Sequence, residues 1–155
     1  MLEVCSTTLP QTVIPAIFSD SRYKPYLKER AKKYSKKADI AYKIFSKVSG
    51  IVAPKPEGAF YMSIVFEDGV LTDKQTLPIE NSEVKKYIED SVKGISPDKR
   101  FAYYLMGATG ICVVPLSGFN SELLGFRVTL LEVDEAKFND TVERIAGAIK
   151  TYLKS

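Results

Sequence analysis

The stretch that decides the fold lies in the last third of the chain. Two apolar runs stand close together there, Gly110-Ile111-Cys112-Val113-Val114-Pro115-Leu116-Ser117-Gly118-Phe119 and Gly125-Phe126-Arg127-Val128-Thr129-Leu130-Leu131. Both runs are rich in β-branched and aromatic residues, which predicts two strands joined by a turn. The second run carries a single charged residue, Arg127, among apolar neighbours.

A guanidinium inside an apolar strand needs a partner, because burying an uncompensated charge is costly. One candidate partner is an anion that arrives from outside, and the planar fork of an arginine fits a carboxylate best. The other is an internal carboxylate such as Glu132 or Glu57. The position of Arg127 in the strand leaves both alternatives open.

The remaining sequence alternates helical periodicity with short apolar runs. The predicted elements are a loop over 7–11, a short helical turn over 13–18, a long helix over 23–48, a strand over 59–66, helices over 82–94 and 97–109, strands over 111–114 and 126–133, and a final helix after Asp134. Short links between the last strands favour antiparallel pairing. The sequence therefore predicts a two-layer α/β sandwich of the α+β type, with a small, mainly antiparallel sheet and helices on one face.

The amino-acid composition excludes several classes of catalytic and metal-binding site. The chain has 155 residues, 45% of them hydrophobic and 26% charged, and no histidine. The lack of histidine excludes Ser-His-Asp and Cys-His catalysis and any histidine-ligated metal, so no metal site is expected. Two cysteines, Cys5 and Cys112, make neither a zinc motif nor a disulfide framework, and we expect Cys112 to be buried. Without a signal peptide or a membrane span, a cytoplasmic protein is expected.

Three further segments could carry function. Gly58-Ala59-Phe60-Tyr61 could bring backbone and aromatic rings to a pocket, although a strand start with core aromatics is the simpler interpretation. The turn holding Ser117 and Phe119 could lie beside a ligand or be a plain loop. The lysine-rich face of the long helix could bind nucleic acid, but no aromatic residues interleave with its lysines. A solvated face is favoured there, and no nucleic-acid partner is expected.

Together these segments resemble the C-terminal portion of the fold-type I pyridoxal-phosphate aminotransferases of class I/II, nearest their alanine and aspartate aminotransferase-like members. The resemblance rests on residues 55–62, 109–119 and 125–132, which stand in the family's order and spacing. The long helix with Arg30 and Tyr34 and the closing helix after Asp134 also follow that order. The domain plan it implies is a remnant of the large cofactor-binding domain (1–20), a long interdomain helix (21–50) and the small C-terminal domain (51–155).

The resemblance also implies an activity. The full-length parent would be a homodimer that uses pyridoxal 5'-phosphate to transfer an amino group between an amino acid and a 2-oxo acid. In such enzymes the arginine of the Gly-Phe-Arg segment, here Arg127, binds the substrate α-carboxylate. The residues that could wall this pocket are Gly58, Phe60, Tyr61, Ser117 and Phe119.

The family's Schiff-base lysine and phosphate-binding residues belong to the large domain, and no lysine in this sequence stands in that context. We therefore assign no catalytic residue here. The chain is expected to be a fragment that neither binds the cofactor tightly nor turns over alone. The alternative is a stand-alone, non-catalytic binding or interaction module derived from the same fold.

Overall fold

The computed structural model describes residues 7–155, so Cys5 and the rest of residues 1–6 lie outside the described residues. The chain divides between Lys33 and Tyr34 into two compact units, which are described separately. Helix α2 (Tyr23–Phe45) continues from the first unit into the second. No helix in the described part of the chain is both long enough and apolar enough to cross a membrane.

The first unit holds α1 (Thr8–Ser19) and the beginning of α2. The ring of Phe18 packs edge-on against Tyr23, with the centroids 5.2 Å apart. The predicted loop over 7–11 is wrong, because α1 already begins at Thr8. Pro10 stands in its first turn, where a backbone N–H has no helical partner, so the proline that suggested a loop is tolerated there.

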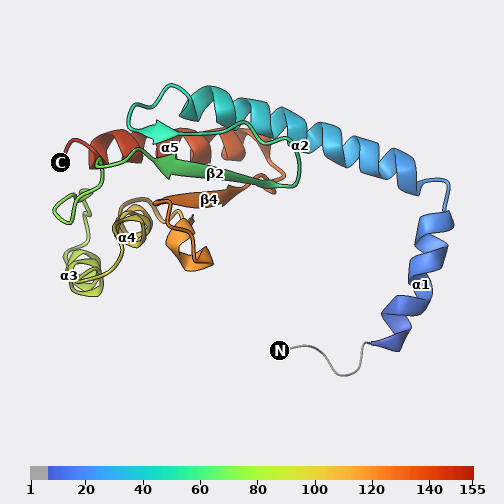
Figure 1. The fold of residues 1–155 in the computed structure, drawn as a ribbon, viewed down its shortest axis with the longest axis horizontal. Coiled ribbons are helices and arrows are strands. Elements are labelled where there is room, and N and C mark those ends of the chain that lie inside the picture. The colour runs from blue at the N-terminus through green and yellow to red at the C-terminus, as the bar shows by residue number, and fades with distance from the viewer. Residues whose placement is uncertain (1–6) are drawn as a thin grey trace. The chain divides into compact units, whose positions relative to one another are not determined.

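The second unit is built on a small sheet of four strands (Figure 1). The strands are β1 (Ile51–Val52), β2 (Tyr61–Phe66), β3 (Val114–Pro115) and β4 (Gly125–Thr129), and they pair antiparallel in the order β1-β2-β4-β3. The strand expected over 111–114 is reduced to its last residue and Pro115, and the one expected over 126–133 ends at Thr129. Gly110 ends the preceding helix in the left-handed conformation, and residues 111–113 then cross to the sheet without strand pairing.

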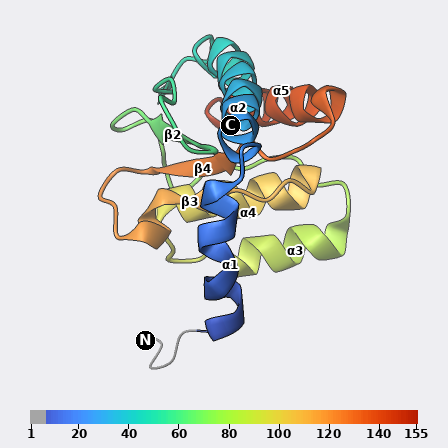
Figure 2. The same ribbon diagram turned by 90° about the vertical axis from the view of Figure 1, so that its right-hand side faces the viewer.

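Three helices follow the predicted pattern: α3 (Ser82–Ser91), α4 (Pro97–Thr109) and α5 (Glu135–Tyr152). The Asn81 side chain accepts two backbone hydrogen bonds and caps α3. Asp134 caps α5 in the same way, through the N–H groups of Ala136 and Lys137. These caps confirm the predicted helix starts, since each satisfies donors that a helix leaves free in its first turn. Helix α3 lies beside α4 (Figure 2).

The core forms on one face of the sheet. Along β2, Met62, Ile64 and Phe66 are buried, as the alternation in the sequence predicted. The Phe101 ring of α4 reaches Phe66 at 5.2 Å between centroids, Phe126 at 5.3 Å and Tyr152 of α5 at 5.1 Å. Helices α4 and α5 therefore pack on the face that carries Phe66 and Phe126, which confirms the predicted two-layer α/β architecture.

Candidate functional site

Arg127 lies in the middle of the sheet, on the face opposite the core. Its Cα pairs with Ser63 of β2 on one side and with Val114 of β3 on the other. The neighbouring Phe126 is fully buried, whereas Arg127 itself is half-buried. This alternation confirms that Arg127 points away from Phe126, because successive strand residues face opposite sides of a sheet.

Two aromatic rings hold the Arg127 guanidinium. Its Cζ lies 4.2 Å from the ring centroid of Tyr61 in β2 and 4.1 Å from that of Phe119. Phe119 ends a 3-10 turn, η1 (Leu116–Phe119), between β3 and β4. Tyr61 is 37% and Phe119 46% exposed, so the three side chains form an open aromatic and cationic surface. Contacts of this kind attract a guanidinium by about 0.5–2 kcal/mol each.

Neither of the two internal carboxylates considered from the sequence neutralises Arg127. Glu132 instead forms an ion pair with Lys137 at 3.1 Å and accepts a hydrogen bond from the Asp134 N–H. That N–H, followed by Lys137, lowers the pKa of Glu132 below its ordinary value. Glu57 is exposed, and within residues 7–155 the guanidinium of Arg127 contacts the two rings. Among residues 7–155, the guanidinium thus forms no ion pair with a carboxylate.

A buried carboxylate secures the turn that carries Phe119. Asp98, in the first turn of α4, is fully buried. Its oxygens accept hydrogen bonds from the Ser117 N–H at 2.9 Å, the Ser117 hydroxyl at 2.7 Å, the Ser96 hydroxyl at 2.6 Å and the Lys99 N–H at 2.8 Å. Burial raises the pKa of Asp98, but these four hydrogen bonds outweigh it and hold the pKa below its ordinary value.

The sequence analysis missed Asp98 because its partner Ser117 belongs to another element. The only signal was Ser96-Pro97-Asp98, which indicates a helix start and predicts nothing about a distant turn. Of the residues expected around a pocket, Tyr61 and Phe119 contact Arg127, and Ser117 anchors the turn. Phe60 contacts Tyr61, with 4.4 Å between centroids, and so extends the aromatic surface.

A Cβ placed at Gly58 would meet nothing within 4 Å. A close backbone approach within the sheet occurs at Gly125, where a Cβ would lie 2.2 Å from the backbone oxygen of Ile64. The expectation that Cys112 is buried is wrong, since it is exposed. Residues 111–113 connect α4 to the sheet, with Val113 buried and Ile111 packed partly against the core. A place for Gly58 in a pocket wall stays a prediction.

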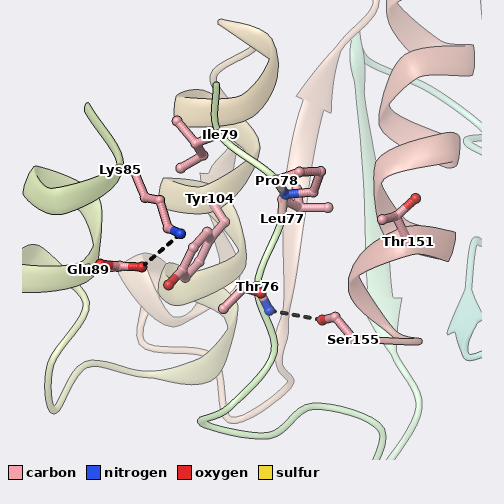
Figure 3. A pocket seen from close by; sticks show the side chains of 9 residues that line it. All are labelled: Thr76, Leu77, Pro78, Ile79, Lys85, Glu89, Tyr104, Thr151 and Ser155. Carbon is pink, nitrogen blue, oxygen red and sulfur yellow. Dashed lines mark hydrogen bonds and ion pairs between the residues drawn. The ribbon is translucent and has the colours of Figure 1, made fainter. Parts of the chain in front are cut away.

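A separate hollow of about 410 Å³ lies between α3, α4 and the end of α5 (Figure 3). Two pairs of its polar residues interact with each other. Lys85 faces Glu89 at 3.9 Å, and the Thr76 N–H donates to the Ser155 hydroxyl at 2.9 Å. A ligand site normally offers convergent polar groups to its ligand. We therefore place the candidate site at Arg127.

Known proteins similar to this chain are aminotransferases. No family model matches the chain. It is 49% identical over all 155 residues to an uncharacterized aminotransferase of Methanocaldococcus jannaschii, and spans 36% of that relative. It is 31% identical over 126 residues to an inactive alanine aminotransferase of Saccharomyces cerevisiae, covering 76% of the chain and 22% of the relative.

Solved structures that resemble this chain are also aminotransferases. The crystal structure of the aspartate aminotransferase from Rhizobium meliloti superposes with a TM-score of 0.61 at 29% identity, covering 81% of this chain and 27% of that one. An aminotransferase from Candida albicans shares the fold with a TM-score of 0.54 at 14% identity, covering 77% of this chain and 25% of that one. The homologues of this chain are thus aminotransferases, and it corresponds to the C-terminal part of enzymes similar to alanine and aspartate aminotransferases.

Proposed function

We propose that this chain is the C-terminal part of a pyridoxal-phosphate-dependent aminotransferase, in which Arg127 binds the α-carboxylate of the substrate. The observation that carries the proposal is the state of Arg127. Its guanidinium is half-buried and lies close to the rings of Tyr61 and Phe119, and neither Glu57 nor Glu132 neutralises it. A guanidinium placed in this way is prepared to accept a planar anion through two parallel hydrogen bonds.

A carboxylate anchor serves both halves of an amino-group transfer. The amino acid that enters and the 2-oxo acid that leaves carry the same carboxylate, so one arginine holds both. Binding at this end fixes the orientation of the substrate Cα, and positioning of this kind accounts for a large part of enzymatic rate enhancement. The rings of Tyr61 and Phe119 displace water around the guanidinium, which strengthens its interaction with an anion.

Pyridoxal phosphate would supply the electron sink for this chemistry. The cofactor is attached to its enzyme through a lysine amine. The side chains that contact the Arg127 guanidinium are the aromatic rings of Tyr61 and Phe119, and neither can serve for this attachment. Lysines such as Lys36 and Lys55 form ion pairs with Glu135 and Asp39 and are more than half exposed. The residues present do not fit the cofactor, so we assign this chain only the carboxylate-binding role. The relatives are about three times longer, and the parts that this chain does not cover would hold the cofactor.

The remaining features of the parent enzyme are part of the proposal. They are the plan of a large-domain remnant (1–20), an interdomain helix (21–50) and a small domain (51–155), a homodimeric assembly, a cytoplasmic location, and an amino acid with a 2-oxo acid as substrates. The relatedness to aminotransferases over the whole chain supports the substrate class.

The carboxylate anchor can be tested on the chain itself. A charge-assisted pair is worth about 1.5–3 kcal/mol, which corresponds to a dissociation constant on the order of 10–100 mM. In a titration with propionate, the Arg127 Nε–H resonance should shift and saturate in this range, whereas the neutral isostere propionamide should leave it in place. Arg127→Gln should abolish saturable binding.

Arg144 provides the matched control, since its guanidinium donates to the Thr109 carbonyl on the surface. Arg144→Gln should bind propionate as the wild type does. Equal responses of Arg127 to propionate and propionamide, or equal responses of Arg127 and Arg144 to propionate, would refute the anchor.

A test of the transferase role needs the part of the relatives that this chain does not cover. The chain can replace the matching 155 residues of the Methanocaldococcus jannaschii relative, to which it aligns end to end. We expect the hybrid to transfer amino groups to a 2-oxo acid from at least one member of an amino acid panel. Arg127→Gln should lower kcat/KM for that amino acid by about a hundredfold or more. A hybrid with bound cofactor and unchanged kinetics after this substitution would contradict the proposal.

A further inference from the structure

We infer that Asp98 is a positioning residue for Arg127, acting through Ser117 and Phe119. The inference rests on the proposed function, since the placement of Arg127 matters because the guanidinium receives a carboxylate. Asp98 does not touch the guanidinium. It fixes the η1 turn, and the last residue of that turn, Phe119, lies against the guanidinium.

The first step is the link between Asp98 and the turn. Two of the four hydrogen bonds to its carboxylate come from Ser117, through the backbone N–H at 2.9 Å and the hydroxyl at 2.7 Å. Ser117 lies 19 residues away in sequence, in the middle of η1. The carboxylate therefore connects the beginning of α4 to the turn.

The second step is the link between the turn and Arg127. Phe119 stands two residues after Ser117, and its ring centroid lies 4.1 Å from the Arg127 Cζ. Almost half of the Phe119 side chain is exposed, so packing alone holds its ring loosely. Its position depends on the backbone of η1, and Asp98 holds that backbone at Ser117.

Simple capping of α4 does not account for this arrangement. The residue at the N-cap of α4 is Ser96, whose side chain makes no capping hydrogen bond and donates to Asp98 instead. Asp98 is fully buried, and the groups that donate to it are two serine hydroxyls and two backbone N–H groups, which are all neutral. Burial of a carboxylate without a cationic partner is costly. The two hydrogen bonds from Ser117 offset part of the cost of burying this carboxylate. They also hold the turn in place beside the candidate site.

The test measures the position of the Phe119 ring directly. An aromatic ring close to a guanidinium shifts the nearby arginine resonances upfield, so the Arg127 side-chain signals of the chain report on Phe119. Phe119→Leu removes the ring, so the change that it causes in the Arg127 signals is the reference for complete loss of this contact. We expect Asp98→Asn to reproduce at least half of that change, because an amide turns donors towards the Ser117 N–H. Ser117→Ala, which removes one hydrogen bond, should give a smaller change in the same direction.

Ser121→Ala is the matched control. Ser121 lies in the same connection, and its hydroxyl oxygen accepts from the Leu123 N–H without involving Asp98. Its substitution should leave the Arg127 signals in place. If Asp98→Asn does not fold, the Arg127 signals of the Ser117→Ala variant decide whether the inference holds. The inference would be overturned if Phe119→Leu moves the Arg127 signals but the folded Asp98 or Ser117 variant leaves them at their wild-type positions.

Propionate binding connects the positioning role to the proposed function. Loss of one cation–π contact should weaken binding of propionate by about two- to fivefold in Asp98→Asn. If the wild type does not bind propionate, the proposed function fails, and the ring-current comparison still decides whether Asp98 positions Phe119. If the wild type binds and Asp98→Asn binds equally well, the positioning role fails and the anchor stands.

Discussion

Substitution of Gly125 by alanine tests the close contact between the two central strands. Gly125 pairs with Val65 in the antiparallel ladder of β2 and β4. A Cβ at this position would lie 2.2 Å from the Ile64 backbone oxygen and 3.0 Å from the Val65 Cα, whereas ordinary van der Waals contact begins at 3.4 Å. Both atoms belong to the backbone and cannot rotate away, so the strands must separate by roughly 1 Å.

The expected cost follows from that displacement. Overpacking of a closed site costs about 1–3 kcal/mol. Moving β4 also strains the hydrogen bond from the Phe66 N–H to the Leu124 carbonyl, now 2.9 Å long, and a bond of this kind contributes about 1 kcal/mol. We expect Gly125→Ala to lower the free energy of unfolding by about 2–4 kcal/mol in total, measured from urea midpoints.

Gly147 in α5 is the matched control, because a Cβ there meets nothing within 4 Å. Gly147→Ala should raise the free energy of unfolding by about 0.5–1 kcal/mol, since alanine is the better helix former. The two substitutions are chemically identical and should act in opposite directions. A Gly125→Ala chain with the urea midpoint of the wild type would show that β2 and β4 are not packed as closely as described.

Three further predictions concern buried groups. Phe101→Ala should cost about 3–5 kcal/mol in a denaturation experiment, whereas Val133→Ala at a 90% exposed position should stay within about 0.5 kcal/mol of the wild type. Burial raises the pKa of Tyr152 to about 12, so its contribution is fully present below the ordinary value of 10.0 and is lost as the pH rises through 12. Tyr152→Phe should therefore flatten the alkaline loss of stability, and an unchanged alkaline profile would count against this. The pKa of Asp98 lies below 3.8, so its stabilisation is present above that pH and disappears as the pH falls through the folded-state pKa. Asp98→Asn should be less stable at neutral pH and lose less in acid, and parallel acid profiles of variant and wild type would exclude the charged state of Asp98 as the cause.

Local patterns predicted the elements well where one face is buried. The alternation in β2 and the period of α5 place Met62, Ile64 and Phe138 in the core, because burial selects side chains at fixed intervals. The prediction failed at α1, where proline suggested a loop. It also failed at residues 111–113, where an apolar run forms a connection and leaves Cys112 exposed.

The candidate site was predictable only in part. Arg127 stood out because a charge in an apolar strand needs a partner, and the aromatic residues Tyr61 and Phe119 belonged to segments already of interest. What brings them together is the pairing of Ser63 with Arg127, which periodicity within one segment does not reveal. Asp98 escaped notice for the same reason, since its link to Ser117 depends on how two elements dock.

The pairing of β2 with β4 has a consequence for how the chain folds. These strands are neighbours in the sheet, yet all of residues 67–124 lie between them in sequence. Closing such a loop costs conformational entropy before the ladder returns any stabilisation, and non-local pairing of this kind slows folding. Helices α3 and α4, which are formed from the intervening chain, can gain local structure first. Because Tyr61 reaches Arg127 only when the sheet closes, we expect the contact between ring and guanidinium to form late in folding and to serve as a spectroscopic marker of its completion.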